Sequence, residues 1–161
     1  MTEDVILACL HPKVGTIGAD MQTTKISRAI AASPSAVWRV LTDAQTLQTG
    51  EFGILRIEGT IATGEKIKLW SEVSPDRAFT LKVTETEPPF AMVWTGGMPL
   101  GLFTGKRTFR LEEDNGGTRF TMQETFTGLL AGLITKSMPD LNPSFQKFAE
   151  ALASHSQADQ S

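Results

Sequence analysis

The stretch that decides the fold reads Leu102-Phe-Thr-Gly-Lys-Arg-Thr-Phe-Arg-Leu-Glu-Glu-Asp-Asn115-Gly116-Gly-Thr-Arg-Phe-Thr-Met-Gln-Glu-Thr-Phe-Thr127. Asn-Gly between two alternating runs is the strongest short-range signal of a β-hairpin, because both central residues of a type I′ turn need φ > 0. With Asn115 and Gly116 as the loop, the stretch predicts two long antiparallel strands, 102–113 and 118–127.

The same turn fixes which residues face one another across the hairpin. Two apolar pairs fall on one face, Phe109 with Met122 and Leu111 with Phe120. On the other face Glu112 meets Arg119, which suits a solvent-exposed pair of opposite charge. A slip of one residue would send every side chain to the wrong face, so these matches support the register.

This register places Arg107 directly opposite Glu124 on the apolar face. Burying an ion pair among apolar residues is costly unless the two groups satisfy each other with hydrogen bonds. One interpretation is a structural pair between two strands. The other is the polar anchor of a pocket, in which Arg107 binds a carboxylate, phenolate or enolate and Glu124 orients the ligand or moves a proton. These two residues are the candidates for a catalytic role.

Composition excludes several classes of function. The 161 residues are 40% hydrophobic and 20% charged, which suits one soluble domain. A net charge of −3, with no run of lysine or arginine, argues against nucleic-acid binding. No apolar stretch reaches the roughly 18–20 residues that span a membrane. We therefore expect a cytoplasmic protein without integral membrane contact.

Metal and histidine chemistry have few residues to use. Cys9 is the single cysteine, His11 and His155 lie near the ends of the chain, and there is no tyrosine. One cysteine rules out an intrachain disulfide and a multi-cysteine zinc site. We expect neither a metal nor a cofactor.

The segments around the hairpin predict a meander between small helices and one long helix. Residues 21–30 alternate like a strand, and Ser33-Pro34 is typical of a helix start, with a second short helix ending near Gly50. Short turns separate further predicted strands at 54–61, 65–73, 78–86 and 90–95. An apolar stripe then predicts a terminal helix, followed by a polar tail from Ser154; the stripe comprises Leu141, Phe145, Phe148 and Leu152.

Residues 1–20 do not fit this pattern and form an extension in our interpretation. If ordered, residues 5–10 could add an edge strand or contact a second copy of the chain, so a homodimer is one expected form. The rest of the chain predicts an α+β fold, in which a curved antiparallel sheet wraps around the terminal helix and a cavity opens between them. The expected division is an extension at 1–20, one domain at 21–157 and a tail at 158–161.

Apolar side chains on the inner faces of these strands are the expected lining of that cavity, since sites for small hydrophobic ligands are mostly apolar. They are Phe79, Leu81, Met92, Trp94, Phe103, Phe109, Met122 and Phe126. The alternative is that each belongs to an ordinary core. The glycine-rich segment 96–101 is expected to be a mobile loop at the cavity mouth. Residues 128–134 would form the opposite lip, with Leu133 and Ile134 pointing in.

Four segments resemble the START-like superfamily, also called SRPBCC or polyketide cyclase/dehydrase-like, which has the helix-grip fold of the birch pollen allergen. They are Ile26-Ser-Arg-Ala-Ile-Ala-Ala-Ser-Pro-Ser-Ala-Val-Trp38-Arg-Val-Leu-Thr-Asp43, Gly105-Lys-Arg-Thr-Phe-Arg-Leu111, Gly117-Thr-Arg-Phe-Thr-Met-Gln-Glu124-Thr-Phe126-Thr-Gly128 and Phe145-Gln-Lys-Phe148-Ala. The similarity covers about residues 21–155. Arg107 stands where many such relatives carry a histidine, whereas Glu124 matches their acidic residue on the last strand.

The resemblance implies three functions. The first is binding of a small hydrophobic or aromatic molecule, lipid- or polyketide-like, by a carrier or sensor. The second is a cyclase, dehydratase or lyase acting on a polyketide-like or aromatic substrate. The third is a protein-interaction module like the Hsp90 co-chaperone activator domain. The iron site of Rieske-type oxygenases with this fold needs histidines, and the body of this chain has none.

Overall fold

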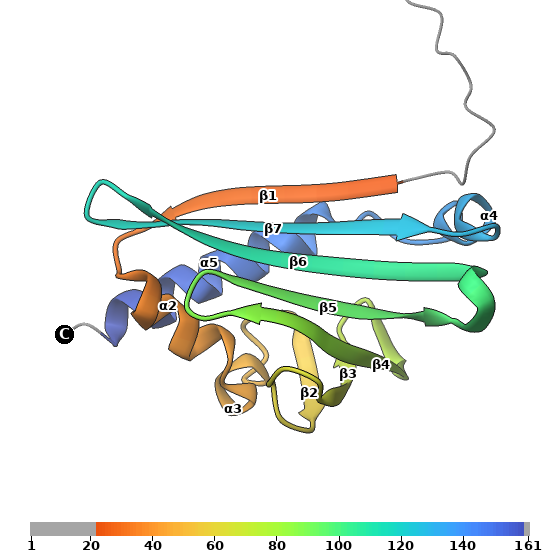
Figure 1. The fold of residues 1–161 in the computed structure, drawn as a ribbon, viewed down its shortest axis with the longest axis horizontal. Coiled ribbons are helices and arrows are strands. Elements are labelled where there is room, and N and C mark those ends of the chain that lie inside the picture. The colour runs from red at the N-terminus through yellow and green to blue at the C-terminus, as the bar shows by residue number, and fades with distance from the viewer. Residues whose placement is uncertain (1–21, 160–161) are drawn as a thin grey trace, which may run out of the picture.

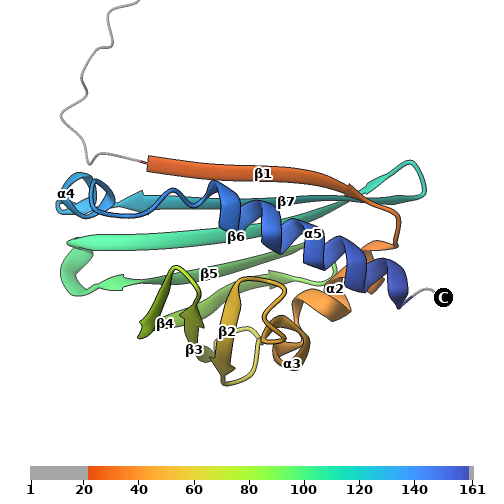
Figure 2. The same cartoon turned by 180° about the vertical axis from the view of Figure 1, so that it is seen from behind.

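The computed structural model describes residues 22–159, apart from the side chains of 85 and 86. The expected extension at 1–20 lies outside the described residues. Seven antiparallel strands form one sheet in the order β1-β7-β6-β5-β4-β3-β2, and helix α5 crosses one face of it (Figures 1 and 2). This is an α+β helix-grip arrangement, as the sequence predicts.

The strands are β1 (Gln22–Ile30), β2 (Ile54–Glu58), β3 (Lys66–Ser71), β4 (Ser74–Glu87), β5 (Ala91–Met98), β6 (Phe103–Asp114) and β7 (Gly117–Thr127). The helices are α2 (Pro34–Leu41), α3 (Ala44–Leu47), α4 (Ala131–Thr135) and α5 (Asn142–Ala158), with a short 3-10 turn, η1 (Pro99–Gly101), between β5 and β6.

The β6–β7 hairpin has the predicted register throughout. Asn115 and Gly116 both have positive φ, at 49° and 81°, as a type I′ turn requires. Arg107 is paired with Glu124, and both predicted apolar pairs are present.

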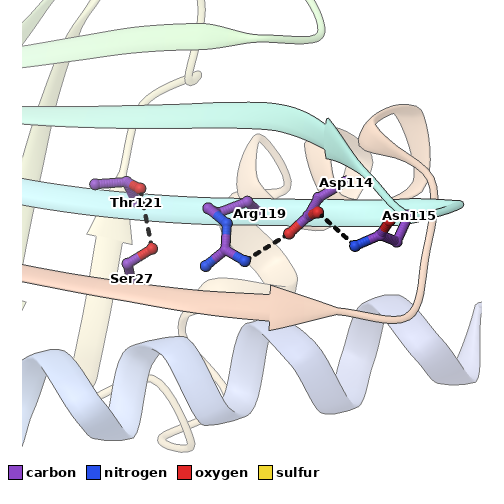
Figure 3. A network of polar contacts seen from close by, with 5 residues as sticks. All are labelled: Ser27, Asp114, Asn115, Arg119 and Thr121. Atoms are coloured by element: carbon purple, nitrogen blue, oxygen red, sulfur yellow. Dashed lines mark hydrogen bonds and ion pairs between the residues drawn. The ribbon is translucent and has the colours of Figure 1, made fainter.

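On the outer face of the hairpin, Arg119 has its predicted register neighbour but forms its ion pair with a different carboxylate. Glu112 is opposite Arg119 in register, but the Arg119 guanidinium donates to Asp114 Oδ2 at 2.6 Å (Figure 3). The Asn115 side chain donates to the other oxygen of Asp114 at 3.0 Å. The arginine side chain therefore reaches along the hairpin toward the turn and binds a carboxylate already oriented there.

Helix α2 begins as its sequence predicts. Ser33 is the N-cap, and its side chain accepts a hydrogen bond from the Ala36 backbone N–H at 3.2 Å. Pro34 occupies the first turn, where its missing N–H costs nothing. The buried side chains of this helix, together with Trp38, place it against the sheet and α5.

Several strand boundaries differ from the prediction. Strand β2 ends at Glu58 and not at residue 61. The β3–β4 turn lies at residues 72–73, and Ser74-Pro75 already belongs to β4. Pairing of β4 with β5 begins only at Lys82, so Pro75 lies where no neighbouring strand needs its N–H. Strand β5 continues through Gly96 and Gly97 to Met98, because these glycines pair with β6. The predicted loop is therefore shorter and consists of η1.

Helix α5 supplies the centre of the core. Phe145, Phe148 and Leu152 of the predicted stripe are buried, and Leu141 packs against the core. The Phe148 ring lies 5.9 Å from Phe109 and 6.2 Å from Phe120, centroid to centroid. The polar tail predicted from Ser154 is wrong, since α5 continues to Ala158 and Ser156 is fully buried.

Candidate functional site

The concave face of the sheet has a closed region and an open region. Helix α5 crosses the sheet toward α2 and leaves uncovered the halves of β5 and β6 next to α4 (Figure 2). In the closed region, four predicted cavity residues are only 0–1% exposed, namely Met92, Trp94, Phe109 and Met122. These four side chains are therefore core residues in this conformation.

The Arg107–Glu124 pair lies at the border of the two regions. Both Nε and Nη2 of Arg107 donate to the same carboxylate oxygen, Oε2, and the Nε bond measures 2.9 Å. The side chains are 23% and 15% exposed. The two groups therefore satisfy each other across the strands while water still reaches them.

Uncharged residues surround this pair. Trp94 and Thr24 are its register neighbours on β5 and β1. The Phe145 ring from the first turn of α5 covers the guanidinium, with Cζ 5.2 Å from the ring centroid. Such a cation–π contact stabilises arginine when water is partly excluded.

Two paired glycines continue the concave face beside the ion pair. Gly96 of β5 is opposite Gly105 of β6. A Cβ on Gly105 would lie 3.3 Å from the Phe126 ring and 3.8 Å from Glu124 Oε1. A Cβ on Gly96 would come within 2.6 Å of a terminal methyl of Leu81. Gly105 therefore leaves an inward position without a side chain, and the ring of Phe126 covers it. Gly96 instead lies against the backbone of β4, because the Thr80 carbonyl oxygen would be 2.8 Å from the same Cβ.

The remaining predicted cavity residues lie in this open region. Phe103 stacks on Phe126 with centroids 5.6 Å apart and ring planes 13° apart. Phe79 carries the Arg77 guanidinium on its ring at 5.3 Å. Leu81, Phe79 and Phe103 are half-buried, whereas Phe126 is buried. The structure thus divides the predicted lining into a packed set and an accessible set.

A pocket of about 370 Å³ adjoins the open region on the β1 side. Its lining combines the start of β1 with the α4–α5 connection and includes Thr24, Phe126, Met138, Asp140 and Leu141. Phe126 belongs to this pocket and also lies against Gly105. Its ring therefore separates the pocket from the glycine pair.

The rim of the open region differs from its prediction. Leu133 is 71% exposed and does not point in, because α4 is a single short turn whose buried side is Ala131; Ile134 is half-buried. Leu100 is 96% exposed. The two rim segments contact each other, since the Leu130 N–H donates to the Leu102 carbonyl at 2.9 Å.

Three important residues were not predicted from the sequence. The sequence does hold a signal for Gly105, because a glycine at an inward position of an alternating strand indicates close approach by another group. Phe145 was assigned to the helix stripe and not to the arginine that it covers. Nothing in the order of residues around Thr24 indicates that β1 pairs with β7 next to Glu124.

Two features are absent from the described part of the chain. Among residues 22–159, no group of three or more His, Cys, Asp and Glu side chains could hold a metal ion. No helix in that same range is long and apolar enough to cross a membrane.

Solved structures with this fold support the architecture. Protein MLL2253 from Mesorhizobium loti is 17% identical with a TM-score of 0.66, over 85% of this chain and 98% of that one. The Aha1 dimer from Colwellia psychrerythraea is 19% identical with a TM-score of 0.63, over 82% and 93%. DynU16, a protein of the dynemicin biosynthetic locus, is 15% identical with a TM-score of 0.59, over 85% and 48%. Identities this low show the fold alone.

No curated protein matches the chain by sequence. The family model described as polyketide cyclase / dehydrase and lipid transport matches residues 21–157. The match includes every strand of the sheet, both short helices after β1, and nearly all of α5. The chain therefore belongs to the polyketide cyclase / dehydrase and lipid transport family.

Proposed function

We propose that the protein binds a small hydrophobic or aromatic molecule, lipid- or polyketide-like, in the open region of the concave face. The ligand would lie over Gly105, displace the end of Phe126, and reach Arg107 and Glu124. We expect this binding to take place in the cytoplasm. Family membership supports a ligand of this kind but does not identify it.

The observation that carries the proposal is the combination of an accessible ion pair with the neighbouring inward position of Gly105, which has no side chain. Sites for small ligands are mostly apolar and contain a few polar groups that fix orientation. Phe126, Leu81 and Phe103 supply the apolar surface here, and the Arg107–Glu124 pair supplies the polar groups. Aromatic and leucine side chain ends can move by rotamer changes without altering the sheet.

A fluorescence titration with N-phenyl-1-naphthylamine tests the proposal. Gly105→Leu would fill the space over residue 105. We expect it to weaken binding at least about tenfold, because the ligand and the new side chain need the same space. Gly105 has no unusual φ, so the backbone accepts the change. Lys106→Leu is the matched control, since it adds the same side chain to the outer face of the same strand. Equal binding by both variants would contradict this location.

A second candidate function is catalysis by a cyclase, dehydratase or lyase. It is supported by the carboxylate oxygen of Glu124 that Arg107 does not bind. Glu124 Oε1 has no hydrogen-bond partner among the described residues, whereas Oε2 takes both bonds from Arg107. A free carboxylate oxygen can accept a proton, and a fixed guanidinium can stabilise a developing enolate. Glu124→Gln retains the shape but removes the base. If a substrate is turned over, we expect this variant to lose at least about a hundredfold in kcat, and unchanged turnover would exclude Glu124 as the base.

The third candidate, a protein-interaction module, would use the exposed rim. Leu100, Leu129 and Leu133 are all largely exposed there. A dimer formed through this surface would dissociate on dilution, and Leu129→Ser would weaken it. Light scattering of both proteins over a range of concentrations provides the measurement, and a monomer at every concentration would argue against this form of self-association.

A further inference from the structure

We propose that this site selects an uncharged ligand that offers a hydrogen-bond acceptor and a hydrogen-bond donor on neighbouring atoms, and that Glu124 excludes carboxylates. This inference rests on the proposed binding site and specifies the chemistry of its ligand.

The charge balance of the site disfavours a ligand carboxylate. Arg107 and Glu124 neutralise each other, and the residues that touch or flank them are uncharged: Trp94, Thr24, Phe126 and Phe145. Lys106 and Lys25 alternate with inward residues of β6 and β1 and are exposed on the outer face. Asp140 in the adjoining pocket adds a negative charge. The Arg77 guanidinium of the open region lies over the Phe79 ring. A ligand carboxylate over Gly105 would therefore find no spare cation among these neighbours of the ion pair.

One donor atom and one acceptor atom of the ion pair remain free to bind a ligand. Nε and Nη2 of Arg107 are both directed at Oε2 of Glu124. Within residues 22–159, neither Nη1 of Arg107 nor Oε1 of Glu124 has a partner in the protein. The free donor and the free acceptor belong to one rigidly paired unit. A ligand with a carbonyl next to a hydroxyl or N–H group would satisfy both atoms without breaking the ion pair.

The free carboxylate oxygen of Glu124 is accessible to such a ligand. Oε1 lies 3.8 Å from the position that a Cβ of Gly105 would take. Because Gly105 has no side chain, this oxygen borders the space over Gly105 in which the ligand would lie. A hydroxyl or N–H of a ligand over Gly105 could therefore donate to Oε1, which a carboxylate ligand cannot do.

A carboxylate ligand would meet the opposite conditions. One guanidinium would then face two carboxylates, and Glu124 would lose part of its compensation while remaining mostly buried. Like charges in a partly desolvated site repel each other, and a partly buried charge without a full partner is destabilising.

Four naphthalene probes of nearly equal size test the inference by isothermal titration at pH 7.5. They are 2-naphthamide with a donor and an acceptor, 2-acetylnaphthalene with an acceptor only, 2-naphthoate with a negative charge, and 2-methylnaphthalene with no polar group. We expect 2-naphthamide to bind at least about tenfold more tightly than 2-naphthoate, with 2-acetylnaphthalene between them.

Glu124→Gln should reverse the preference, because it removes the negative charge while an amide still faces Arg107. The ratio of the 2-naphthamide to the 2-naphthoate affinity should fall at least about tenfold in this variant. Glu112→Gln removes the same charge from the exposed face of the hairpin and should leave the ratio unchanged.

The outcomes separate the inference from the proposed function. If 2-methylnaphthalene binds and 2-naphthoate equals or exceeds 2-naphthamide, or the Glu124→Gln ratio is unchanged, the selectivity is refuted and the binding site stands. If none of the four probes binds, both are refuted.

Discussion

The closed and open regions of the concave face are built from the same strands but differ in what covers them. In the closed region, Phe148 of α5 contacts Phe109 and Phe120, and all three side chains are buried. In the open region, the same face carries two glycines and an ion pair. The movable ring of Phe126 lies over Gly105, whereas Leu81 and the Thr80 carbonyl lie against Gly96. Alternation along a strand therefore determines which face of the sheet a side chain lies on. The path of α5 determines whether that side chain is buried in the core or remains accessible.

We expect the largest loss of unfolding free energy from a substitution in the closed region. Phe148→Ala would leave a large void between α5 and the sheet, and we expect it to lower the free energy of unfolding by about 3–5 kcal/mol. Phe103→Ala in the open region should cost clearly less, because Phe103 is already half-exposed. Urea denaturation of both variants measures the difference. Equal losses would show that the two regions do not differ in packing.

We expect an intermediate loss of unfolding free energy from a substitution in the ion pair at the border of the two regions. Arg107→Met leaves the mostly buried Glu124 carboxylate without its partner, and we expect a loss of about 2 kcal/mol in unfolding free energy. Lys106→Met removes the same charge from the outer face and should change stability by no more than about 0.5 kcal/mol. Thermal and urea unfolding of the pair provide the test. If Arg107→Met is as stable as Lys106→Met, the ion pair does not support the hairpin.

The smallest effect is expected at the rim. Leu133 is largely exposed, so Leu133→Ser should leave the free energy of unfolding within about 0.5 kcal/mol of the wild-type value. A melting curve is sufficient to measure this. A large loss of stability would mean that α4 packs Leu133 against the sheet in solution, as the sequence first suggested.

The hairpin was predictable because its information is local. Asn115-Gly116 requires a type I′ turn, and the turn then determines the pairing of Arg107 with Glu124. Ser33-Pro34 defines the start of α2 in the same way. In these cases a few neighbouring residues determine the geometry.

The exposure of individual side chains was not predictable, because it depends on distant elements. Met92 and Phe103 both fall on the concave face, yet one is sealed by the core and the other is half-exposed. The extent of β5 was missed for a related reason, since Gly96-Gly97 is typical of a turn and only pairing with β6 keeps it extended. Leu133 was misplaced because a single-turn helix gives too few residues to establish an inward face.

The central claim is that the open region binds a small apolar molecule, and amide chemical shifts locate such binding most directly. We would titrate the 15N-labelled protein with 2-naphthamide and follow its 1H–15N spectrum. The account predicts that the largest shifts belong to Gly96, Gly105 and Glu124, with α2 unaffected. Shifts confined to the shallow pocket between α2 and His155, or no shifts at all, would contradict it.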